Sequence, residues 1–388
     1  MLRILRPTIT RRFLHNVPFQ DDLTPADLDD FNLGDFQHYE PTPKPTSFDY
    51  YTTLSQPIIF NSKLTDPYLN LALEQHIYNQ MPKPDEVTIN TNRVLFYVNS
   101  PCVVIGKNQN PWKEVNLPLL NLLGIPLLRR YSGGGTVVHD FGNVNFSFMT
   151  TKEKFDRLKF SNTVVEAINS IPGLTKNVMV NDRGDIITTE GGFKVSGSAY
   201  KLSRGKSYHH GTMLLNSNLK VLSKLLSRDE SKLGIVEALN VINSVKSKVT
   251  NLSIESRDFI EGVIKQVNQE YKLDPIQVVD ITTDTELPGE IHDIANELRS
   301  WQWKFGKTPQ FTHEFTHKHF KIKFHIDKQA AIEKFELITD NQELRDKFKY
   351  LEQYIKDNKL EYTGSNVAGY ILDDGISDWI GECIDGTV

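Results

Sequence analysis

Three consecutive glycines, at positions 133 to 135, interrupt the segment RRYSGGGTVVHD. Each one gives up side-chain packing and costs roughly 0.5–1 kcal/mol relative to alanine in a regular helix or strand. The phosphate-loop pattern GxxxxGK[ST] is not met, because its lysine and spacing are missing, and GxGxxG fails because Val138 stands at its last glycine. The run therefore predicts either a loop whose bare N–H groups approach an anion or carboxylate, or a plain hairpin turn.

Two arginines precede the glycines. Arg129 and Arg130 end a predicted strand, so their side chains point to opposite faces of it. We therefore expect at most one of them to face a ligand held by the glycine loop.

Length and composition narrow the remaining possibilities. A chain of 388 residues suggests two domains, or one large domain with an appendage. The net charge of −5 argues against a nucleic-acid partner, and no stretch approaches 18 consecutive apolar residues, so no membrane span is predicted. Cys102 and Cys383 are far apart and in no metal-type spacing, and we expect buried thiols in a reducing compartment.

The first residues have a composition of their own. Residues 1–20 contain four arginines and no acid, which is typical of a mitochondrial transit peptide and predicts a matrix protein. The alternative is a merely basic N-terminus. Residues 21–55 are acidic, contain several prolines and show no sustained periodicity, so we expect a disordered linker.

The apolar pattern predicts a first folded part, a catalytic domain over residues 56–278. Asp66 is expected to cap a helix over 67–81, and Ser161 a helix over 161–171. The other expected elements are a broken helix over 116–125, strands at 57–60, 93–100, 102–106, 126–130 and 142–150, a hairpin over 185–201 turning at Glu190-Gly191-Gly192, and charged helical segments from about 217 to 275.

A smaller accessory domain is expected over residues 279–388. A helix over 291–300 precedes an aromatic strand, WQWKF, two alternating strands at 311–327 and 330–340, and helices to the end. Strands and helices do not alternate strictly, so the predicted class is α+β with mixed or antiparallel strands.

A second polar constellation lies downstream of the glycines. Lys194 opens KVSGSAY, where small residues leave room for a ligand against the backbone, and His209-His210-Gly211 follow. A lysine there could supply positive charge to a phosphate or a developing oxyanion. The alternative is an ordinary surface lysine on a hairpin.

The segment His313 to His317 matches HExxH, the signature of zinc proteases. That signature works on a helix, whereas the flanking residues alternate as in a strand, where four residues span about 13 Å. We therefore predict no metal site there, and we expect His317 and His319 to lie on a solvated strand face.

Together these segments resemble the lipoate–protein ligase family over roughly residues 57–345. The matching motifs, in family order, are SKLTDPYLNLALEQHIYNQM, CVVIGKNQNPWKEVN, RRYSGGGTVVHDFGNVNFSF, KVSGSAY and HHGTMLLN. The resemblance implies a catalytic domain of the biotin/lipoate-ligase type, with a mixed sheet like that of class II synthetases. It also implies ATP and Mg²⁺ as cofactors, lipoate as substrate and lipoyl-AMP as intermediate. The implied acceptors are apo lipoyl domains of 2-oxoacid dehydrogenase complexes and the glycine-cleavage H protein.

The resemblance also implies roles for particular residues. Lys194 would be catalytic, through its charge and not as a nucleophile. The implied ATP or adenylate contacts are Arg130, Gly135, Thr136, Val137, Val138, Asp185 and Lys194; the implied lipoate contacts are Ser132, Gly133, Gly134, Gly135, His139, Asn143, Lys194 and Gly197. The segment NDRGDII departs from the family's pattern around its acidic residue. Asp185 is the favoured match, and Asp182 is the alternative.

Three other functions are alternatives to an ATP-dependent ligase. The same loop and lysine would serve a lipoyl or octanoyl transferase that uses a preactivated donor, such as an acyl-CoA or lipoyl-H protein. A non-catalytic protein that binds lipoyl domains would be expected to have lost Lys194, which is present. A biotin ligase would need a GRGRxG loop, which has no counterpart here. The sequence does not separate lipoate from octanoate, and it leaves the oligomeric state open.

Overall fold

The computed structural model describes residues 47–84, 90–273 and 275–388. The expected transit peptide and the linker up to residue 46 lie outside the described residues. The prediction of a linker reaching residue 55 is wrong for its last part, which forms α2 (Phe48–Thr53), capped by the Ser47 side chain. The buried guanidinium of Arg93 donates to carbonyls of this segment, including that of Thr52, and so fixes the segment against the sheet.

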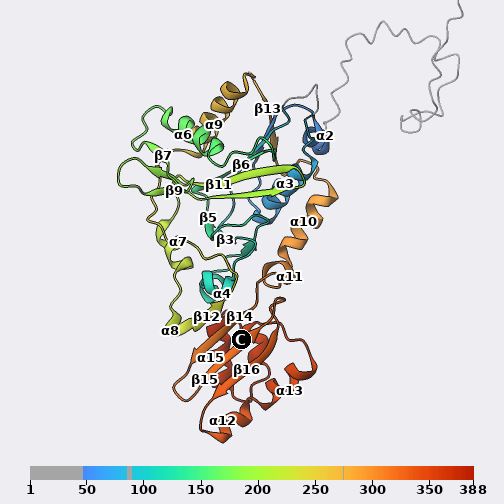
Figure 1. The fold of residues 1–388 in the computed structure, drawn as a ribbon, viewed down its shortest axis with the longest axis vertical. Helices are drawn as coiled ribbons and strands as arrows, with labels where there is room; N and C mark the ends of the chain where they lie inside the picture. The colour runs from blue at the N-terminus through green and yellow to red at the C-terminus, as the bar shows by residue number, and fades with distance from the viewer. Residues whose placement is uncertain (1–46, 85–89, 274) are drawn as a thin grey trace, which may run out of the picture. The chain divides into compact units, whose positions relative to one another are not determined.

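A six-stranded mixed sheet, in the order β10-β11-β6-β2-β1-β13, forms the centre of the fold (Figure 1). β1 is parallel to both β2 and β13, and the other neighbours are antiparallel. The strands are β1 (Ile58–Ser62), β2 (Arg93–Tyr97), β6 (Asn143–Thr151), β10 (Ser198–Ser203), β11 (Lys206–Leu214) and β13 (Gln277–Ile281). The predicted strands at 57–60, 93–100 and 142–150 are therefore confirmed.

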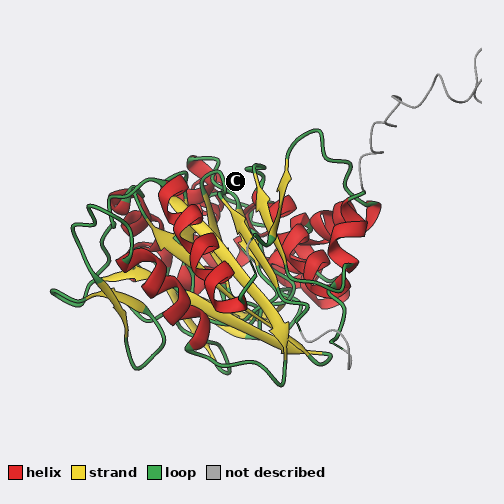
Figure 2. Ribbon diagram, turned by 90° about the horizontal axis from the view of Figure 1, so that it is seen from above, coloured by secondary structure: helices red, strands yellow, loops and turns green. Residues whose placement is uncertain are grey.

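Helices cover both faces of this sheet (Figure 2). Side chains alternate between the faces, so Ile59 packs with α6 (Lys159–Asn169) and α9 (Ser256–Tyr271). Its neighbour Phe60 packs with α3 (Pro67–Gln80) and α10 (Gly289–Arg299). This is the period of two that a strand buried on both faces imposes.

The two predicted helix caps have different outcomes. Asp66 does cap α3, because its side chain accepts from the N–H groups of Tyr68 and Leu69. Ser161 does not cap α6, whose N-cap is Leu158. Ser161 lies within α6, and its buried hydroxyl donates to the Gly184 carbonyl outside the helix. This tertiary contact replaces the capping hydrogen bond that a serine often makes.

Two small sheets carry the loops described below. One has the order β4-β3-β5 and the other β7-β8-β9. Gly191 and Gly192 have positive φ between β8 and β9, which confirms the predicted hairpin turn. The strands are β3 (Cys102–Ile105), β4 (Leu127–Arg129), β5 (Val137–His139), β7 (Val178–Val180), β8 (Ile186–Thr188) and β9 (Lys194–Ser196).

The C-terminal part is an antiparallel sheet, β12-β14-β15-β16, with helices packed against it. β12 (Ile235–Ala238) comes from the region predicted to be helical, and a boundary at 278/279 would divide β13, so the expected domain limits need correction. Both differences result from pairing between strands that are distant in sequence, β12 with β14 and β13 with β1. Such pairing leaves no signal in the local sequence. The remaining elements are β14 (Phe311–Thr316), β15 (Lys321–Ile326), β16 (Ile332–Ile338), α4 (Pro111–Glu114), α5 (Leu117–Leu122), α7 (Leu219–Leu226), α8 (Glu230–Leu233), α11 (Trp301–Lys304), α12 (Gln342–Lys347), α13 (Lys349–Asp357), α14 (Gly364–Ala368) and α15 (Asp374–Ile384).

Two further predictions in this part are wrong. WQWKF is not a strand but α11, because the Ser300 side chain accepts from the Trp303 N–H and caps a helical turn. The segment 311–327 is not one strand but the hairpin β14–β15, in which Phe311 pairs with Ile326.

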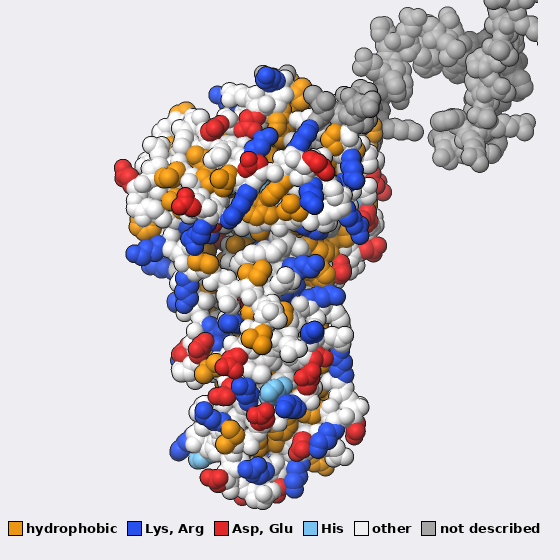
Figure 3. All heavy atoms as spheres, in the orientation of Figure 1, with side chains coloured by type: hydrophobic (Ala, Val, Ile, Leu, Met, Phe, Trp, Pro, Cys, Tyr) orange, Lys and Arg blue, Asp and Glu red, His pale blue; other side chains and the backbone are white. Residues whose placement is uncertain are grey.

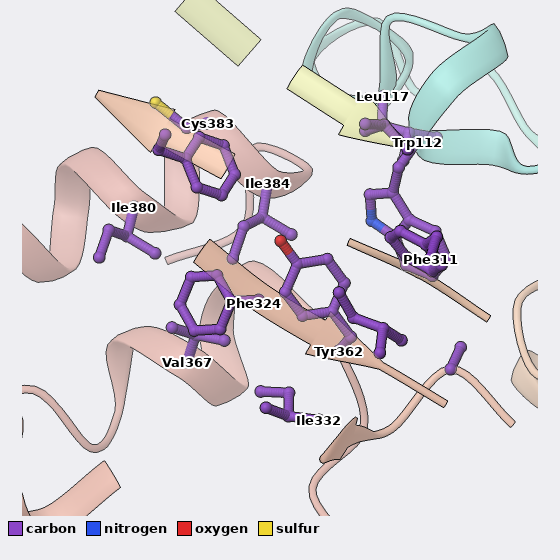
Figure 4. Close-up of a cluster of buried hydrophobic side chains, with 14 of the residues drawn as sticks. Trp112, Leu117, Phe311, Phe324, Ile332, Tyr362, Val367, Ile380, Cys383 and Ile384 are labelled. Carbon is purple, nitrogen blue, oxygen red and sulfur yellow. The ribbon is translucent and has the colours of Figure 1, made fainter. Parts of the chain in front are cut away.

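One large apolar cluster joins the C-terminal sheet to α4 and α5 (Figure 4). Trp112 stacks on Phe311 with ring centroids 5.0 Å apart. Cys383 belongs to this cluster and Cys102 is also buried, as predicted. Among the residues described, no helix has the length and apolar character needed to cross a membrane.

Candidate functional site

A cavity of about 310 Å³ lies between the glycine loop, β9 to β11 and the segment 242–245. One end is closed, and its apolar residues Leu71, Tyr97 and Val104 are each at most 3% exposed. At the other end Val245 is 67% exposed, so this end opens to solvent. The deeply buried part of the lining also contains Arg130, His139 and His210, each at most 7% exposed. A cavity that is buried at one end and open at the other suits a small molecule with an apolar and a polar part.

Lys194 and Asp185 meet on the cavity wall. Lys194 Nζ lies 2.7 Å from Asp185 Oδ1, and Arg183 Nη2 lies 3.7 Å from Asp185 Oδ2. The hairpin β8–β9 creates this contact, because it brings residues nine apart in sequence onto neighbouring strands. Asp182 is exposed and does not line the cavity. The geometry therefore favours Asp185 as the acidic residue of the site.

The two arginines before the glycines do point in different directions. Arg129 is fully buried and donates to the Lys304 carbonyl and the Thr308 hydroxyl, away from the cavity. Arg130 lines the cavity, but its Nη2 donates to the carbonyls of Gly133 (2.6 Å) and Gly135 (2.7 Å). Burial lowers the pKa of Arg130 to about 10, which leaves it charged at neutral pH. Arg130 thus holds the glycine loop in shape, and its implied phosphate contact stays a prediction.

The three glycines are required for different reasons. Gly134 has φ +86°, and a Cβ there would lie 3.0 Å from Arg130 Nη2. A Cβ on Gly135 would lie 3.2 Å from Ser244 Oγ. A Cβ on Gly133 would meet only Ile242 Cδ1, at 4.0 Å. The protein itself therefore explains Gly134 and Gly135, whereas nothing among the described residues crowds Gly133.

Sequence reasoning missed the residues that tie the loop to the segment 242–245. Ser244 Oγ accepts from the Thr136 N–H (2.9 Å) and from Gln109 Nε2 (3.0 Å). Gln109 Oε1 in turn accepts from the Thr136 hydroxyl (3.0 Å). The glutamine belongs to the quoted motif GKNQNPW, so the motif alone could have drawn attention to it.

A buried chain of polar groups below the glycine loop was also missed. Glu74, on α3, accepts from His210 Nδ1 at 2.9 Å. Ser132 Oγ lies 2.7 Å from His210 Nε2, and Arg130 Nε donates to Ser132 Oγ at 3.0 Å. The order serine–histidine–acid is that of a hydrolase triad. However, Ser132 is 1% exposed and lies outside the cavity lining, so the chain supports Arg130 and presents no accessible nucleophile.

The cavity gathers most, but not all, of the site residues expected from the sequence. Those that line it are Arg130, Gly134, Gly135, Thr136, Val137, His139, Asp185, Lys194 and Gly197. Ser132, Gly133, Val138 and Asn143 do not line it. Asn143 is fully buried and donates to Asn145 Oδ1, so it sits behind the wall of the cavity.

The HExxH segment lies on β14, as its alternation predicted. His317 and His319 are accessible to solvent, but they lie in the turn between β14 and β15 and not on a strand. His313 is buried, with Tyr362 Oη 2.8 Å from its Nδ1 and the Leu233 carbonyl 2.7 Å from its Nε2. Both ring nitrogens thus have protein partners. In the described parts of the chain, no group of three or more histidine, cysteine or acidic side chains is arranged to hold a metal ion.

Proteins of known sequence match most of this chain. Proteins of Saccharomyces cerevisiae that carry the provisional name lipoate-protein ligase A are 38% identical over 309 residues, covering 78% of this chain and 74% of theirs. The human mitochondrial lipoyl amidotransferase is 37% identical over 295 residues, covering 72% of this chain and 76% of its own.

Solved structures share the fold. The crystal structure of P. falciparum LipL1 in complex with lipoate superposes with a TM-score of 0.55 at 23% identity, covering 84% of this chain and 98% of that one. A bi-partite lipoate protein ligase from Thermoplasma acidophilum, studied with its E2 lipoyl domain, superposes with a TM-score of 0.51 at 23% identity, covering 65% of this chain and 96% of that one. The predicted α+β ligase-type fold is confirmed.

The family profile agrees with both comparisons. Residues 66–272 match the profile described as "Lipoyl protein ligase A/B catalytic domain". This range contains every residue that lines the cavity. The chain belongs to the lipoyl protein ligase A/B family.

Proposed function

We propose that this protein is an ATP-dependent lipoate–protein ligase, which activates lipoate as lipoyl-AMP and transfers the acyl group to a lysine of an apo lipoyl domain. The observation that carries the proposal is the Lys194–Asp185 pair on the wall of a cavity with one apolar closed end. The acyl chain would enter the closed end, because burying its apolar surface there is favourable. Its carboxylate would then lie beside Lys194.

The reaction would then proceed through two nucleophilic displacements. A carboxylate oxygen of lipoate attacks the α-phosphorus of ATP, and pyrophosphate leaves. The neutral amine of the acceptor lysine then attacks the carbonyl carbon, AMP leaves, and the amine proton passes to solvent. Lys194 Nζ would stabilise negative charge on the carbonyl and α-phosphate oxygens in both steps.

The walls of the cavity suit the two halves of lipoyl-AMP. Gly134, His139 and Gly197 would contact the acyl chain, and Gly135, Thr136 and Val137 the nucleotide. The buried hydroxyl of Ser198 has no partner among the described residues and offers hydrogen-bonding capacity to a ligand. The implied residues outside the lining, which are Ser132, Gly133, Val138 and Asn143, would act from behind it.

The cavity lining could hold Mg²⁺ through one carboxylate together with the phosphates of the substrate. The ion is usually held by one or two carboxylates together with substrate phosphates. Of the described residues that line the cavity, Asp185 is the only carboxylate, so it would share the ion with the phosphates. When bound, the ion would neutralise phosphate charge.

The acceptors and the compartment are part of the proposal. Lys and Arg side chains (blue) gather on the face drawn in Figure 3, over the part that Figure 1 labels β6, β9 and β11. Such a face favours acidic partners. We take the acceptors to be lipoyl domains of 2-oxoacid dehydrogenase complexes and the glycine-cleavage H protein. The mitochondrial human relative and the acid-free residues 1–20 support the matrix as compartment.

A transferase is the second candidate, and the human relative named lipoyl amidotransferase favours it. Lys194 would serve the second displacement alone, with a preactivated acyl group as donor. The cavity geometry is compatible with either donor.

Intact-mass spectrometry separates the two candidates. The full chain would be incubated with an apo lipoyl domain and either lipoate, ATP and Mg²⁺, or octanoyl-CoA, or lipoyl-H protein. A lipoyl mass gain that requires ATP supports the ligase. A gain only from a preactivated donor supports the transferase, and no gain from any donor contradicts both.

A further inference from the structure

A line of four buried polar side chains runs from the closed end of the cavity into the protein. Asn99 Nδ2 lies 2.9 Å from His139 Nδ1. Asn70 Nδ2 donates to Asn99 Oδ1 at 2.8 Å, and Ser62 Oγ donates to Asn70 Oδ1 at 2.7 Å. All four side chains are less than 9% exposed, so water does not compete for these bonds.

Backbone groups fix the direction of this line. Asn70 Nδ2 also donates to the Leu64 carbonyl at 2.9 Å, and a carbonyl can only accept. The Leu64 N–H donates to Ser62 Oγ, which leaves the Ser62 hydroxyl hydrogen for Asn70 Oδ1. The amide of Asn70 therefore has one possible orientation. Asn99 must then turn its oxygen to Asn70 and its NH₂ group to His139.

The orientation of Asn99 decides the tautomer of His139. An NH₂ group facing Nδ1 requires a lone pair on that nitrogen, so the ring is neutral and its proton lies on Nε2. Burial, followed by the charges of Arg130 and His210, also lowers the pKa of His139, to about 3. Two separate effects thus favour the same neutral form.

The Nε2–H group of His139 faces the cavity without a protein partner. His139 lines the cavity, and its Nε2 has no hydrogen bond among the described residues. Nε2 is not one of the described side-chain atoms that lack both a hydrogen-bond partner and contact with solvent, so it is accessible. His210 differs, because Glu74 and Ser132 occupy both of its ring nitrogens. At the closed end, His139 therefore presents a free donor, with Arg130 and His210 among its neighbours in the lining.

We propose that Asn99 holds His139 as a neutral Nε2–H donor, and that this donor selects acyl chains ending in an acceptor atom over chains of similar length ending in a methyl group. The selectivity rests on the proposed function, in which the tail of the acyl chain reaches the closed end. A dithiolane sulfur is a weak acceptor for the N–H, whereas the methyl group of octanoate leaves the donor buried and unpaired. His139 is thus a specificity-determining residue and Asn99 a positioning residue.

Nitrogen NMR tests the tautomer without any assay of activity. The full chain would carry ¹⁵N-histidine, and the His139 signals are those lost in His139→Leu. We expect a neutral ring with Nε2 protonated at pH 7, and a shift of the proton to Nδ1 in Asn99→Asp, whose carboxylate can only accept. An Nδ1-protonated ring in the unchanged protein would overturn the inference.

Affinities for lipoate and octanoate, measured by calorimetry, test the selectivity. We expect the unchanged protein to prefer lipoate, and the lipoate-to-octanoate affinity ratio to fall about fivefold in His139→Leu, because an unpaired buried donor no longer penalises octanoate. The exposed His292 serves as control, and His292→Gln should keep the ratio. An unchanged ratio in His139→Leu overturns the selectivity. If neither acid binds, the proposed function fails and the selectivity fails with it, whereas the NMR result concerns the tautomer alone.

Discussion

Lys194 Nζ and Asp185 Oδ1 lie 2.7 Å apart on the wall of the cavity, with side chains 24% and 15% exposed. An ion pair with this partial access to solvent contributes little to folding. Under the proposed function, its place on the cavity wall would serve binding and charge stabilisation.

Replacing Lys194 with alanine should abolish acyl transfer and leave the fold intact. We expect transfer to fall at least about 100-fold, since the positive charge that stabilises the oxyanion is removed. The free energy of unfolding should change by less than about 1 kcal/mol, because the ion pair is partly exposed. Intact-mass kinetics and urea unfolding measure the two quantities. The exposed Lys220, on α7, provides the matched control Lys220→Ala. Normal transfer by Lys194→Ala would contradict the assignment.

The choice between the two candidate aspartates can be tested by paired substitutions. Asp185→Asn should slow transfer about tenfold, because Lys194 loses the carboxylate that orients it, an effect within the range seen for supporting residues. Asp182→Asn should leave the rate unchanged, because Asp182 is exposed and outside the cavity. The same assay serves both variants. A larger effect at Asp182 would reverse the assignment.

Two of the glycines should respond differently to alanine. Gly134→Ala should lower the free energy of unfolding by about 1–2 kcal/mol, since its φ of +86° is unfavourable for a residue with a Cβ. Gly133→Ala should have little effect on stability, because its Cβ would meet only Ile242 at 4.0 Å. Urea unfolding measures both. A loss of lipoate binding in Gly133→Ala at full stability would indicate that the ligand itself passes close to this residue.

Acid should destabilise the protein through its buried histidines. Burial lowers the pKa of His139, His209 and His313 to about 3, with smaller contributions from neighbouring positive groups. In the unfolded chain a histidine binds a proton below about pH 6.5, so acidification between pH 6.5 and 3 favours unfolding. Each histidine should remove about 1.4 kcal/mol of stability per pH unit in this window.

His209 isolates one of these contributions. Both of its ring nitrogens are buried without a partner among the described residues. His209→Leu should therefore reduce the loss of stability between pH 6.5 and 5 by about 2 kcal/mol, measured by urea unfolding at the two pH values. An unchanged pH dependence in the variant would show that His209 is protonated in the folded protein.

Sequence patterns that report local burial predicted much of the fold. Alternating or continuous apolar residues located β1, β2 and β6, and helical spacing after Asp66 located α3. The glycine run and KVSGSAY pointed to a loop and a lysine that do meet in one cavity. Glycine clusters and small residues mark places where the backbone must be bare, which is a local requirement.

Contacts between distant residues were not predictable in this way. Glu74 and His210 are 136 residues apart, and β12 joins a sheet whose other strands begin at Phe311. A periodic pattern indicates that a side chain is buried, but it does not identify the residue that the side chain contacts. The segment WQWKF shows that even a local contact can escape prediction. Its aromatic residues suggested a strand, but the Ser300 side chain caps a helical turn there.

The sequence by itself thus determined the family and pointed to the glycine loop and Lys194, because these depend on residue types at fixed local spacing. Only the tertiary structure placed Asp185 and not Asp182 on the cavity wall, turned Arg130 toward the carbonyls of the loop, and brought Asn70 and Asn99 behind His139. Hydrogen-bond partners and amide orientations arise when separate elements pack together, and that packing alone fixes which donor faces the cavity.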